Sequence, residues 1–187
     1  MKKQIISLSL KVILFFIISF QLNASEQAWK TAQEGDKIIL IRHSLAPGGG
    51  DPAGFKIDDC KTQRNLNRAG INQSKKIGKL FKQNNVPVDQ VLSSQWCRCK
   101  DTAKYAFGDF KEFTALNSTF QSPYDKNEGK QLNELYDFVS KWDGKGKNLV
   151  LVTHYSIITA VTNAVPSSGE IVLANKDFDV LGTIQTD

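Results

Sequence analysis

The chain has 187 residues, of which 24 are Lys or Arg, 19 are Asp or Glu, and 41% are hydrophobic. This length and apolar content suffice for one globular domain with its own core, which excludes a wholly disordered chain. The formal net charge of +5 is not accompanied by repeated basic and aromatic residues, so a nucleic-acid partner is not expected.

The first residues have the layout of a secretory signal peptide. A positively charged start precedes an apolar stretch over residues 5–20, and the small residue Ala24 follows. A membrane anchor is the alternative, but the stretch is short for a spanning helix and contains Lys11. We therefore expect residues 1–24 to be removed on export. Residues 25–187 would then form one periplasmic or secreted domain without a stable membrane anchor.

Periodicity then alternates between strand and helix along the chain. Apolar runs of strand length occupy residues 37–43, 89–94, 113–116 and 148–154, and helical spacing occupies residues 66–84, 95–107, 131–142 and 157–164. Asn67 and Ser156 are the expected N-caps of the first and last of these helices. The tail offers two further strands, 169–175 and 177–185, as an antiparallel addition. This order predicts an α/β fold with three α/β/α layers and a mostly parallel sheet.

A long segment rich in Gly, Pro and Asp, residues 46–62, separates the first strand from the first long helix and is predicted to be a loop. It contains Cys60, and the other two cysteines are Cys97 and Cys99. In an oxidising compartment Cys60 is expected to pair with one of these two, since they are too close to bridge each other easily. Free buried thiols and a metal site are the alternatives.

The chain has two histidines, and both follow apolar strands: His43 ends the run 37–43 and His154 ends the run 148–154. Ligands of open α/β sheets bind beyond the carboxyl ends of the strands. Two equivalent positions therefore predict one shared site, although a structural histidine at a strand end is the usual alternative for either residue.

Arginines accompany these histidines. Arg42 precedes His43, Arg98 follows the second predicted strand, and Arg64 precedes the first long helix. Solvated surface charge is the ordinary explanation for an arginine, but a cation that ends a buried strand must be paired or bind a ligand. Guanidinium groups bind phosphate through paired hydrogen bonds, so the sequence predicts a phosphate site.

Four segments, IRHS, LNRAGINQSKKIG, VLSSQWCRCKDTA and VTHYS, occur in this order. Their order and spacing resemble those of the histidine phosphatase superfamily, which has the phosphoglycerate-mutase-like fold. The resemblance spans about residues 37–165, and export makes the chain similar to the branch of lipopolysaccharide core heptose phosphate phosphatases.

By this resemblance His43 is the nucleophile, neutral when it attacks phosphorus and then phosphorylated. Arg42 and Arg98 would hold the phosphoryl oxygens, His154 would complete the pocket, and Arg64 would add a contact. The scheme requires no metal and no cofactor. The implied activity is an exported phosphomonoesterase acting on a phosphorylated small molecule, an envelope glycan or a phosphoprotein.

The sequence departs from the family pattern at three positions. Ser44 replaces a glycine after the first histidine, and Tyr155 replaces a small residue after the second. Both are expected to shape the substrate side of the pocket. Asn117 stands where the family often has its acidic proton donor, so the donor would be another carboxylate or absent. The candidates are Asp51, whose loop follows His43, and also Asp125 and Glu128.

These departures keep two other functions open. The first is a phosphate- or phosphosugar-binding protein of the same fold without catalysis. The second is a thiol redox protein built on Cys97 and Cys99, which would lose activity with Cys97→Ser but not with His43→Ala.

Overall fold

The computed structural model describes residues 24–186 and contains one six-stranded sheet with helices on both faces. The strands are β1 (Ile38–Arg42), β2 (Val88–Ser93), β3 (Lys111–Glu112), β4 (Asn148–Thr153), β5 (Ile171–Ala174) and β6 (Val180–Ile184). They lie in the order β3-β2-β4-β1-β5-β6. The first four strands are mutually parallel, and β5 and β6 add an antiparallel edge. The predicted α/β class with a mostly parallel sheet is confirmed.

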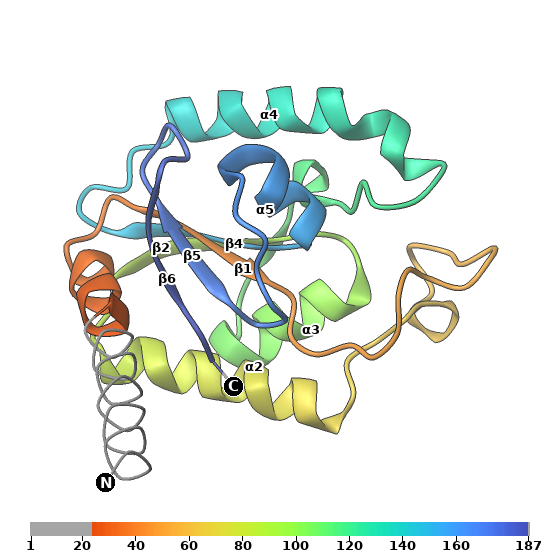
Figure 1. Ribbon diagram of the computed structural model, residues 1–187, viewed down its shortest axis with the longest axis horizontal. Coiled ribbons are helices and arrows are strands. Elements are labelled where there is room, and N and C mark those ends of the chain that lie inside the picture. The colour runs from red at the N-terminus through yellow and green to blue at the C-terminus, as the bar shows by residue number, and fades with distance from the viewer. Residues whose placement is uncertain (1–23, 187) are drawn as a thin grey trace, which may run out of the picture.

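The helices form the two outer layers. They are α2 (Arg68–Gln83), α3 (Cys97–Phe107), α4 (Glu128–Lys141) and α5 (Tyr155–Thr162), with short 3-10 turns η1 (Cys60–Thr62), η2 (Thr114–Leu116) and η3 (Tyr124–Asn127). Figure 1 shows α2 and α3 on one face of the sheet and α4 and α5 on the other. Residues 24–33 are also helical and lie on the α2 side.

Strand β1 explains why a continuous apolar run precedes the first histidine. Its alternate residues Ile39 and Ile41 pack into the core on the α2 and α3 side, whereas Ile38 and Leu40 pack on the α4 and α5 side. All four are fully buried. A strand covered on both faces needs apolar residues at every position. Because the strand is buried, the residues at its carboxyl end have fixed positions at the sheet edge.

Helix α2 begins where the sequence predicts. The Asn67 side chain accepts a hydrogen bond from the Gly70 backbone N–H, as expected of an N-cap. Along the helix, Gly78 approaches α3 so closely that a Cβ there would overlap the carbonyl oxygen of Ala106. Only a glycine permits this contact between the two helices.

Two local predictions are wrong. Residues 113–116 are not a strand: β3 lies earlier and η2 follows it. The carbonyl of Leu116 accepts from Thr153 Oγ1, and Gln131 of α4 donates to the carbonyl of Ala115. These carbonyls therefore bind side chains, and Ala115 and Leu116 are buried against α4 instead of extending the sheet.

The start of the last helix also differs from the prediction. Helix α5 has His154 as its N-cap residue, whereas the expected cap, Ser156, lies inside the helix. The Ser156 hydroxyl accepts a long hydrogen bond from the Thr119 backbone N–H. At the other end Asn163, with φ of 59°, ends the helix shortly before Pro166.

The predicted signal peptide falls almost wholly on residues 1–23, which lie outside the described residues. In the helix of residues 24–33, Ala28 and Ala32 are buried and the Trp29 ring packs edge-on against Phe81, with centroids 5.8 Å apart. Across residues 24–186, no helix has the length and apolar character needed to cross a membrane.

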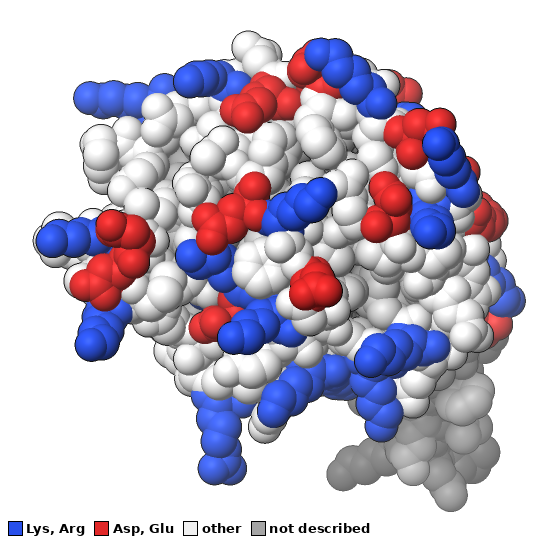
Figure 2. Space-filling model, turned by 180° about the vertical axis from the view of Figure 1, so that it is seen from behind, with Lys and Arg blue, Asp and Glu red and all other residues white. Residues whose placement is uncertain are grey.

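Charge on the face seen in Figure 2 is mixed, with acidic and basic side chains interspersed over much of it. Helix α2 differs from this pattern because its exposed charged residues are all basic. They are Arg68, Lys75, Lys76, Lys79 and Lys82.

Candidate active site

The two histidines meet at the carboxyl ends of β1 and β4. These strands are parallel neighbours, with Arg42 opposite Thr153, and the His43 backbone N–H donates to the Thr153 carbonyl. The imidazole centroids of His43 and His154 lie 5.4 Å apart, and both side chains are buried. The sheet register therefore brings together the two residues that the sequence singles out.

A small cavity of about 100 Å³ opens beside these rings. Its lining residues are Arg42, His43, Gly48, Gly49, Gly50, Asp51, Arg64, Arg98, Ser118, Phe120, Gln121, His154 and Tyr155. A larger groove of about 590 Å³ beside α2 shares none of these residues. Seven predicted site residues therefore line one cavity: Arg42, His43, Asp51, Arg64, Arg98, His154 and Tyr155. Ser44 and the candidate proton donors Asp125 and Glu128 do not line it.

The hydrogen bond of His43 fixes its tautomer. Nδ1 lies 2.9 Å from the carbonyl oxygen of Ser44. A carbonyl can only accept, so Nδ1 carries the proton and Nε2 of the neutral ring keeps its lone pair. Burial, and then the charge of Arg98, lower the pKa of His43 well below its usual range. The ring is thus a neutral imidazole at neutral pH.

His154 is held in the opposite tautomer. An Arg98 Nη2 donor lies 3.5 Å from its Nδ1, and its Nε2 lies 2.9 Å from Ser94 Oγ. Because guanidinium groups only donate, Nδ1 is the acceptor and Nε2–H points to the serine hydroxyl. Burial, followed by the charge of Arg98 and the proximity of His43, lowers the pKa of His154 as well.

Asn117, at the position where the family often has an acid, belongs to a supporting network. Its Oδ1 accepts from Ser94 Oγ at 3.2 Å and from the Gln95 backbone N–H at 2.9 Å. Its Nδ2 donates to the Gln95 side chain. Asn117 therefore orients the serine that holds His154 and is occupied by these bonds.

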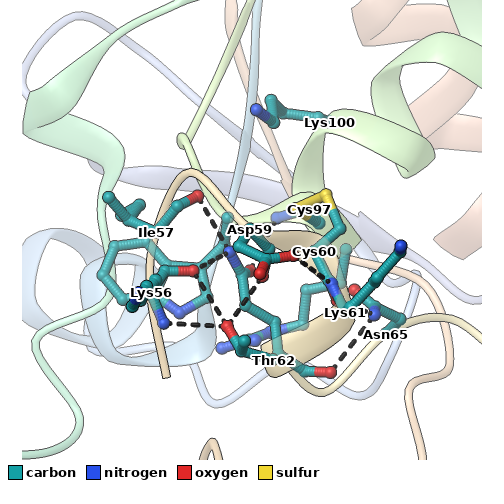
Figure 3. The surroundings of a disulfide bond; sticks show 12 residues. Lys56, Ile57, Asp59, Cys60, Lys61, Thr62, Asn65, Cys97 and Lys100 are labelled. Atoms are coloured by element: carbon teal, nitrogen blue, oxygen red, sulfur yellow. Dashed lines mark hydrogen bonds between the residues drawn. A yellow bond between two sulfur atoms is a disulfide. The ribbon is translucent and has the colours of Figure 1, made fainter. Parts of the chain in front are cut away.

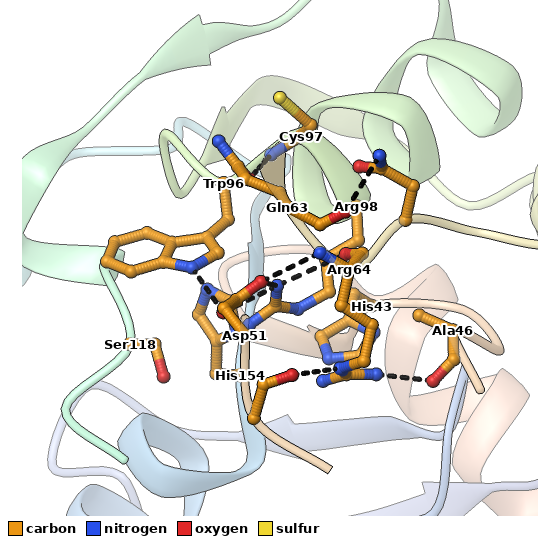
Figure 4. Close-up of polar contacts among 12 residues, drawn as sticks. His43, Ala46, Asp51, Gln63, Arg64, Trp96, Cys97, Arg98, Ser118 and His154 are labelled. Atoms are coloured by element: carbon orange, nitrogen blue, oxygen red, sulfur yellow. Dashed lines mark hydrogen bonds and ion pairs between the residues drawn. The ribbon is translucent and has the colours of Figure 1, made fainter. Parts of the chain in front are cut away.

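Arg98 and Asp51 form a buried ion pair at the cavity wall, shown in Figure 4. Arg98 Nη1 lies 2.8 Å and 3.1 Å from the two carboxylate oxygens, and the two side chains are 3% and 2% exposed. The carboxylate also accepts from Trp96 Nε1 and the Arg64 backbone N–H. Burial raises the pKa of Asp51, but the hydrogen bonds and charge of Arg98 outweigh this and lower it.

Arg42 lines the cavity next to Tyr155. Its Nη1 donates to the Pro166 carbonyl at 2.8 Å, and its guanidinium lies 5.7 Å from the Tyr155 ring centroid. The Nε atoms of Arg42 and Arg98 are buried without a hydrogen-bond partner among the described residues. Buried cationic donors without partners are a feature of an anion site.

Arg64 is largely occupied by its own loop. Its Nε donates to the Gly50 carbonyl at 2.8 Å, and its Nη1 donates to the Ala46 carbonyl. It thereby folds the loop around the cavity. Gly50, with φ of 68°, adopts a backbone conformation that favours glycine at the turn into Asp51.

The structure corrects the expectation for Ser44. This residue is fully buried, its backbone N–H donates to Thr102 Oγ1, and its hydroxyl accepts from Ser74 Oγ of α2. Its side chain therefore packs behind the site and does not line the cavity. Tyr155 does line the cavity, and its ring packs edge-on against Phe120, with centroids 5.7 Å apart.

Of the three candidate proton donors, only Asp51 lines the cavity. Glu128 accepts from Thr119 Oγ1, and Asp125 accepts from the Lys126 backbone N–H. The lowered pKa of Asp51 makes it a carboxylate, which cannot donate a proton.

Ser118, Phe120 and Gln121 also line the cavity. No sequence pattern marks these three residues, because they follow the 3-10 turn η2 and belong to no motif.

Two of the three cysteines form a disulfide bond, and the third is a free thiol. Cys60 in η1 is bonded to Cys97, the first residue of α3, and Figure 3 shows this link between loop and helix. Cys99 is free and buried, and burial raises the pKa of its thiol to about 12. No group of three or more His, Cys, Asp or Glu side chains within the described residues is arranged to hold a metal ion.

The chain is similar in structure to known proteins. No protein-family model and no curated protein matches the chain. Solved structures do match: the protein TTHB049 from Thermus thermophilus is 16% identical with a TM-score of 0.57 over 81% of this chain and 99% of its own. The phosphoglycerate mutase from the same organism is 16% identical with a TM-score of 0.55 over the same shares.

A third match is the protein histidine phosphatase SixA complexed with tungstate, at 12% identity and a TM-score of 0.52 over 81% of this chain and 96% of that one. The chain has the fold of these proteins. At these identities the likeness concerns the fold alone. The resemblance drawn from the four sequence segments is confirmed at that level, and the phosphoglycerate-mutase-like architecture with it.

Proposed function

We propose that the protein is a phosphomonoesterase that acts through a phosphohistidine at His43. The observation that carries the proposal is the hydrogen bond from Nδ1 to the Ser44 carbonyl, which leaves Nε2 as the nucleophilic atom. This neutral ring lies in a cavity lined by three arginines, so an anion can bind beside an atom able to attack it.

In the first step Nε2 of His43 forms a bond to phosphorus. The bond from phosphorus to the leaving group breaks, and the leaving group takes the bonding electrons. Arg42 and Arg98 offset the charge on the phosphoryl oxygens through their buried N–H groups. In the second step water attacks phosphorus, the N–P bond breaks, and its electrons return to Nε2, while the protons of the water stay on the phosphate that forms. Inorganic phosphate leaves, and the scheme uses no metal or cofactor.

The proposed substrate class follows from the missing proton donor. Among residues 24–186, Asp51 is the one carboxylate that lines the cavity, and the pKa shift caused by Arg98 keeps it ionised. A leaving group that departs without protonation by the enzyme is therefore favoured, as in a phosphohistidine of a protein or an aryl phosphate. Envelope phosphosugars, which leave as alkoxides, are the less favoured substrates.

Export is part of the proposal. The layout of residues 1–24 and the disulfide between Cys60 and Cys97 support a periplasmic or secreted location. In such a compartment the thiol-based redox function is disfavoured, since Cys97 is bonded and Cys99 is buried with a raised pKa.

The test is hydrolysis of 4-nitrophenyl phosphate and trapping of the phosphoenzyme. Wild-type protein should turn over the substrate and carry an acid-labile, base-stable phosphoryl group. His43→Gln should abolish both, whereas Asp58→Asn, an exposed change in the loop, should leave both unchanged. Phosphate binding without turnover would instead support the non-catalytic binding protein.

A further inference from the structure

The loop of residues 46–64 is attached to three consecutive residues at the start of α3. Trp96 Nε1 donates to the Asp51 carboxylate at 2.9 Å. The Cys97 backbone N–H donates to Gln63 Oε1 at 3.0 Å, and its sulfur is bonded to Cys60. Arg98 binds Asp51. The loop is therefore fixed at several points onto the turn that carries the cavity arginine.

Asp51 is the centre of this attachment. Its two oxygens accept from Arg98 Nη1, Trp96 Nε1 and the Arg64 backbone N–H, as Figure 4 shows. Its own backbone N–H donates to Gln121 Oε1 at 2.7 Å. A buried carboxylate with this many charge-assisted and neutral donors has one orientation, and it imposes one orientation on its partner.

The pairing leaves part of Arg98 for a ligand. Both contacts to Asp51 use Nη1, Nη2 lies at the long distance of 3.5 Å from His154 Nδ1, and Nε has no partner among the described residues. A long side chain that must hold a phosphoryl oxygen loses rotamer freedom on binding unless it is already held. Asp51 holds it before any ligand arrives.

Asp51 also adjusts the charge of the cavity. Three arginines line it, and the two histidines are neutral. One negative charge from Asp51 leaves two positive charges in excess, which match the two negative charges of a phosphate monoester. Without Asp51, Arg98 and Arg64 would repel each other without compensation.

Building on the proposed function, we propose that Asp51 is a positioning residue that acts through Arg98, and that it is not the proton donor. It fixes the guanidinium that stabilises the transferred phosphoryl group. The two roles differ in a measurable way. A proton donor matters more as the leaving group becomes worse, whereas a residue that orients Arg98 acts on the phosphoryl group and matters equally for every leaving group.

The test compares Asp51→Asn with wild type on 4-nitrophenyl phosphate and phenyl phosphate, whose leaving groups differ in basicity. We expect kcat/KM to fall by the same factor for both, about 10²-fold, as for other displaced catalytic groups. Inhibition by inorganic phosphate should weaken as well. The control Asp58→Asn changes an exposed carboxylate of the same loop and should alter neither quantity.

A second variant tests the same inference if Asp51→Asn does not fold. Trp96→Phe removes one donor to the carboxylate but keeps the Asp51–Arg98 pair, and it should lower kcat/KM by a smaller factor, again equal for both substrates. A larger loss for phenyl phosphate than for 4-nitrophenyl phosphate, or no loss in either variant, would overturn the inference. If wild type neither hydrolyses these esters nor binds phosphate, the proposed function itself fails.

Discussion

His43 and His154 end neighbouring parallel strands, and their rings meet edge to face, with an angle of 67° between their planes. The His43 ring is held at Nδ1 by the Ser44 carbonyl, and the His154 ring is held at Nε2 by the Ser94 hydroxyl and at Nδ1 by Arg98. Arg98 lowers the pKa of both rings in addition to their burial. The surroundings therefore keep both imidazoles uncharged. This affects the pH dependence of the free energy of unfolding as well as the chemistry of the site.

The first prediction concerns stability and pH. The pKa values of His43 and His154 are lowered on folding, so below about pH 6.5 the unfolded chain binds protons that the folded protein does not. The free energy of unfolding should therefore fall as the pH drops below about 6.5 and should be constant with respect to these groups above it. Urea unfolding at several pH values between about 7 and about 4.5 measures this slope.

The control is His43→Gln, which removes one of the two groups and should reduce the slope below about pH 6.5 without changing it above. The lowered pKa of Asp51 adds a separate loss of stability, but only as the pH falls through the range below about 4. A free energy of unfolding that stays constant down to about pH 5 would contradict the expected protonation of the unfolded chain.

The second prediction concerns the disulfide. Cys60 and Cys97 are separated by 37 residues, and closing a loop of that length should stabilise the folded state by about 4 kcal/mol in the chain-entropy account. The Cys60→Ala, Cys97→Ala double variant should lose that amount in urea unfolding. It should also lose part of its affinity for phosphate, because the loop that carries Asp51 and Arg64 is then held less firmly.

Reductant serves as the matched comparison for the disulfide. Dithiothreitol should reproduce the loss of stability in wild type and change nothing in the double variant. Equal unfolding midpoints for oxidised and reduced wild type would show that the disulfide does not stabilise the fold.

The third prediction concerns the contact between α2 and α3. A Cβ on residue 78 would overlap the Ala106 carbonyl oxygen, so Gly78→Ala must force the helices apart. We expect a loss of about 3 kcal/mol or more, because an overpacked site displaces backbone atoms. Gly129→Ala in α4 is the control, since the added carbon meets no atom within 4 Å beyond its own helix and chain neighbours. It should be neutral or stabilising by up to about 1 kcal/mol.

Thermal or urea unfolding measures both glycine variants under the same conditions. Equal free energies of unfolding for Gly78→Ala and Gly129→Ala would contradict the close approach of α2 and α3.

The fourth prediction concerns Phe120, which is 53% exposed at the cavity and packs against Tyr155. Phe120→Ala should raise KM for an aryl phosphate by roughly 2- to 10-fold, the value of one aromatic contact. Inhibition by inorganic phosphate should not change, because phosphate has no ring to contact. Tyr105→Ala, which removes an exposed aromatic ring outside the cavity lining, should change neither. If Phe120→Ala weakened inhibition by inorganic phosphate by the same factor, Phe120 would act on the phosphate pocket itself.

Patterns in the sequence predict much of the framework because their causes are local. The run that precedes Arg42 and His43 needs two covered faces, and Asn67 caps α2 through its own side chain. The region of residues 113–116 is predicted wrongly because its carbonyls bind Thr153 and Gln131, which are distant in sequence. Likewise, neither spacing nor composition could choose between Cys97 and Cys99 as the partner of Cys60.

By itself, then, the sequence determined that two strands would end in histidines beside arginines at one edge of an α/β sheet, because apolar periodicity and residue type are properties of short segments. Only the tertiary structure decided that Ser44 turns to α2, that Asn117 supports Ser94, and that Asp51 is a carboxylate paired with Arg98. These outcomes depend on which donors and acceptors the folded chain brings within hydrogen-bond distance, and no short segment contains that information.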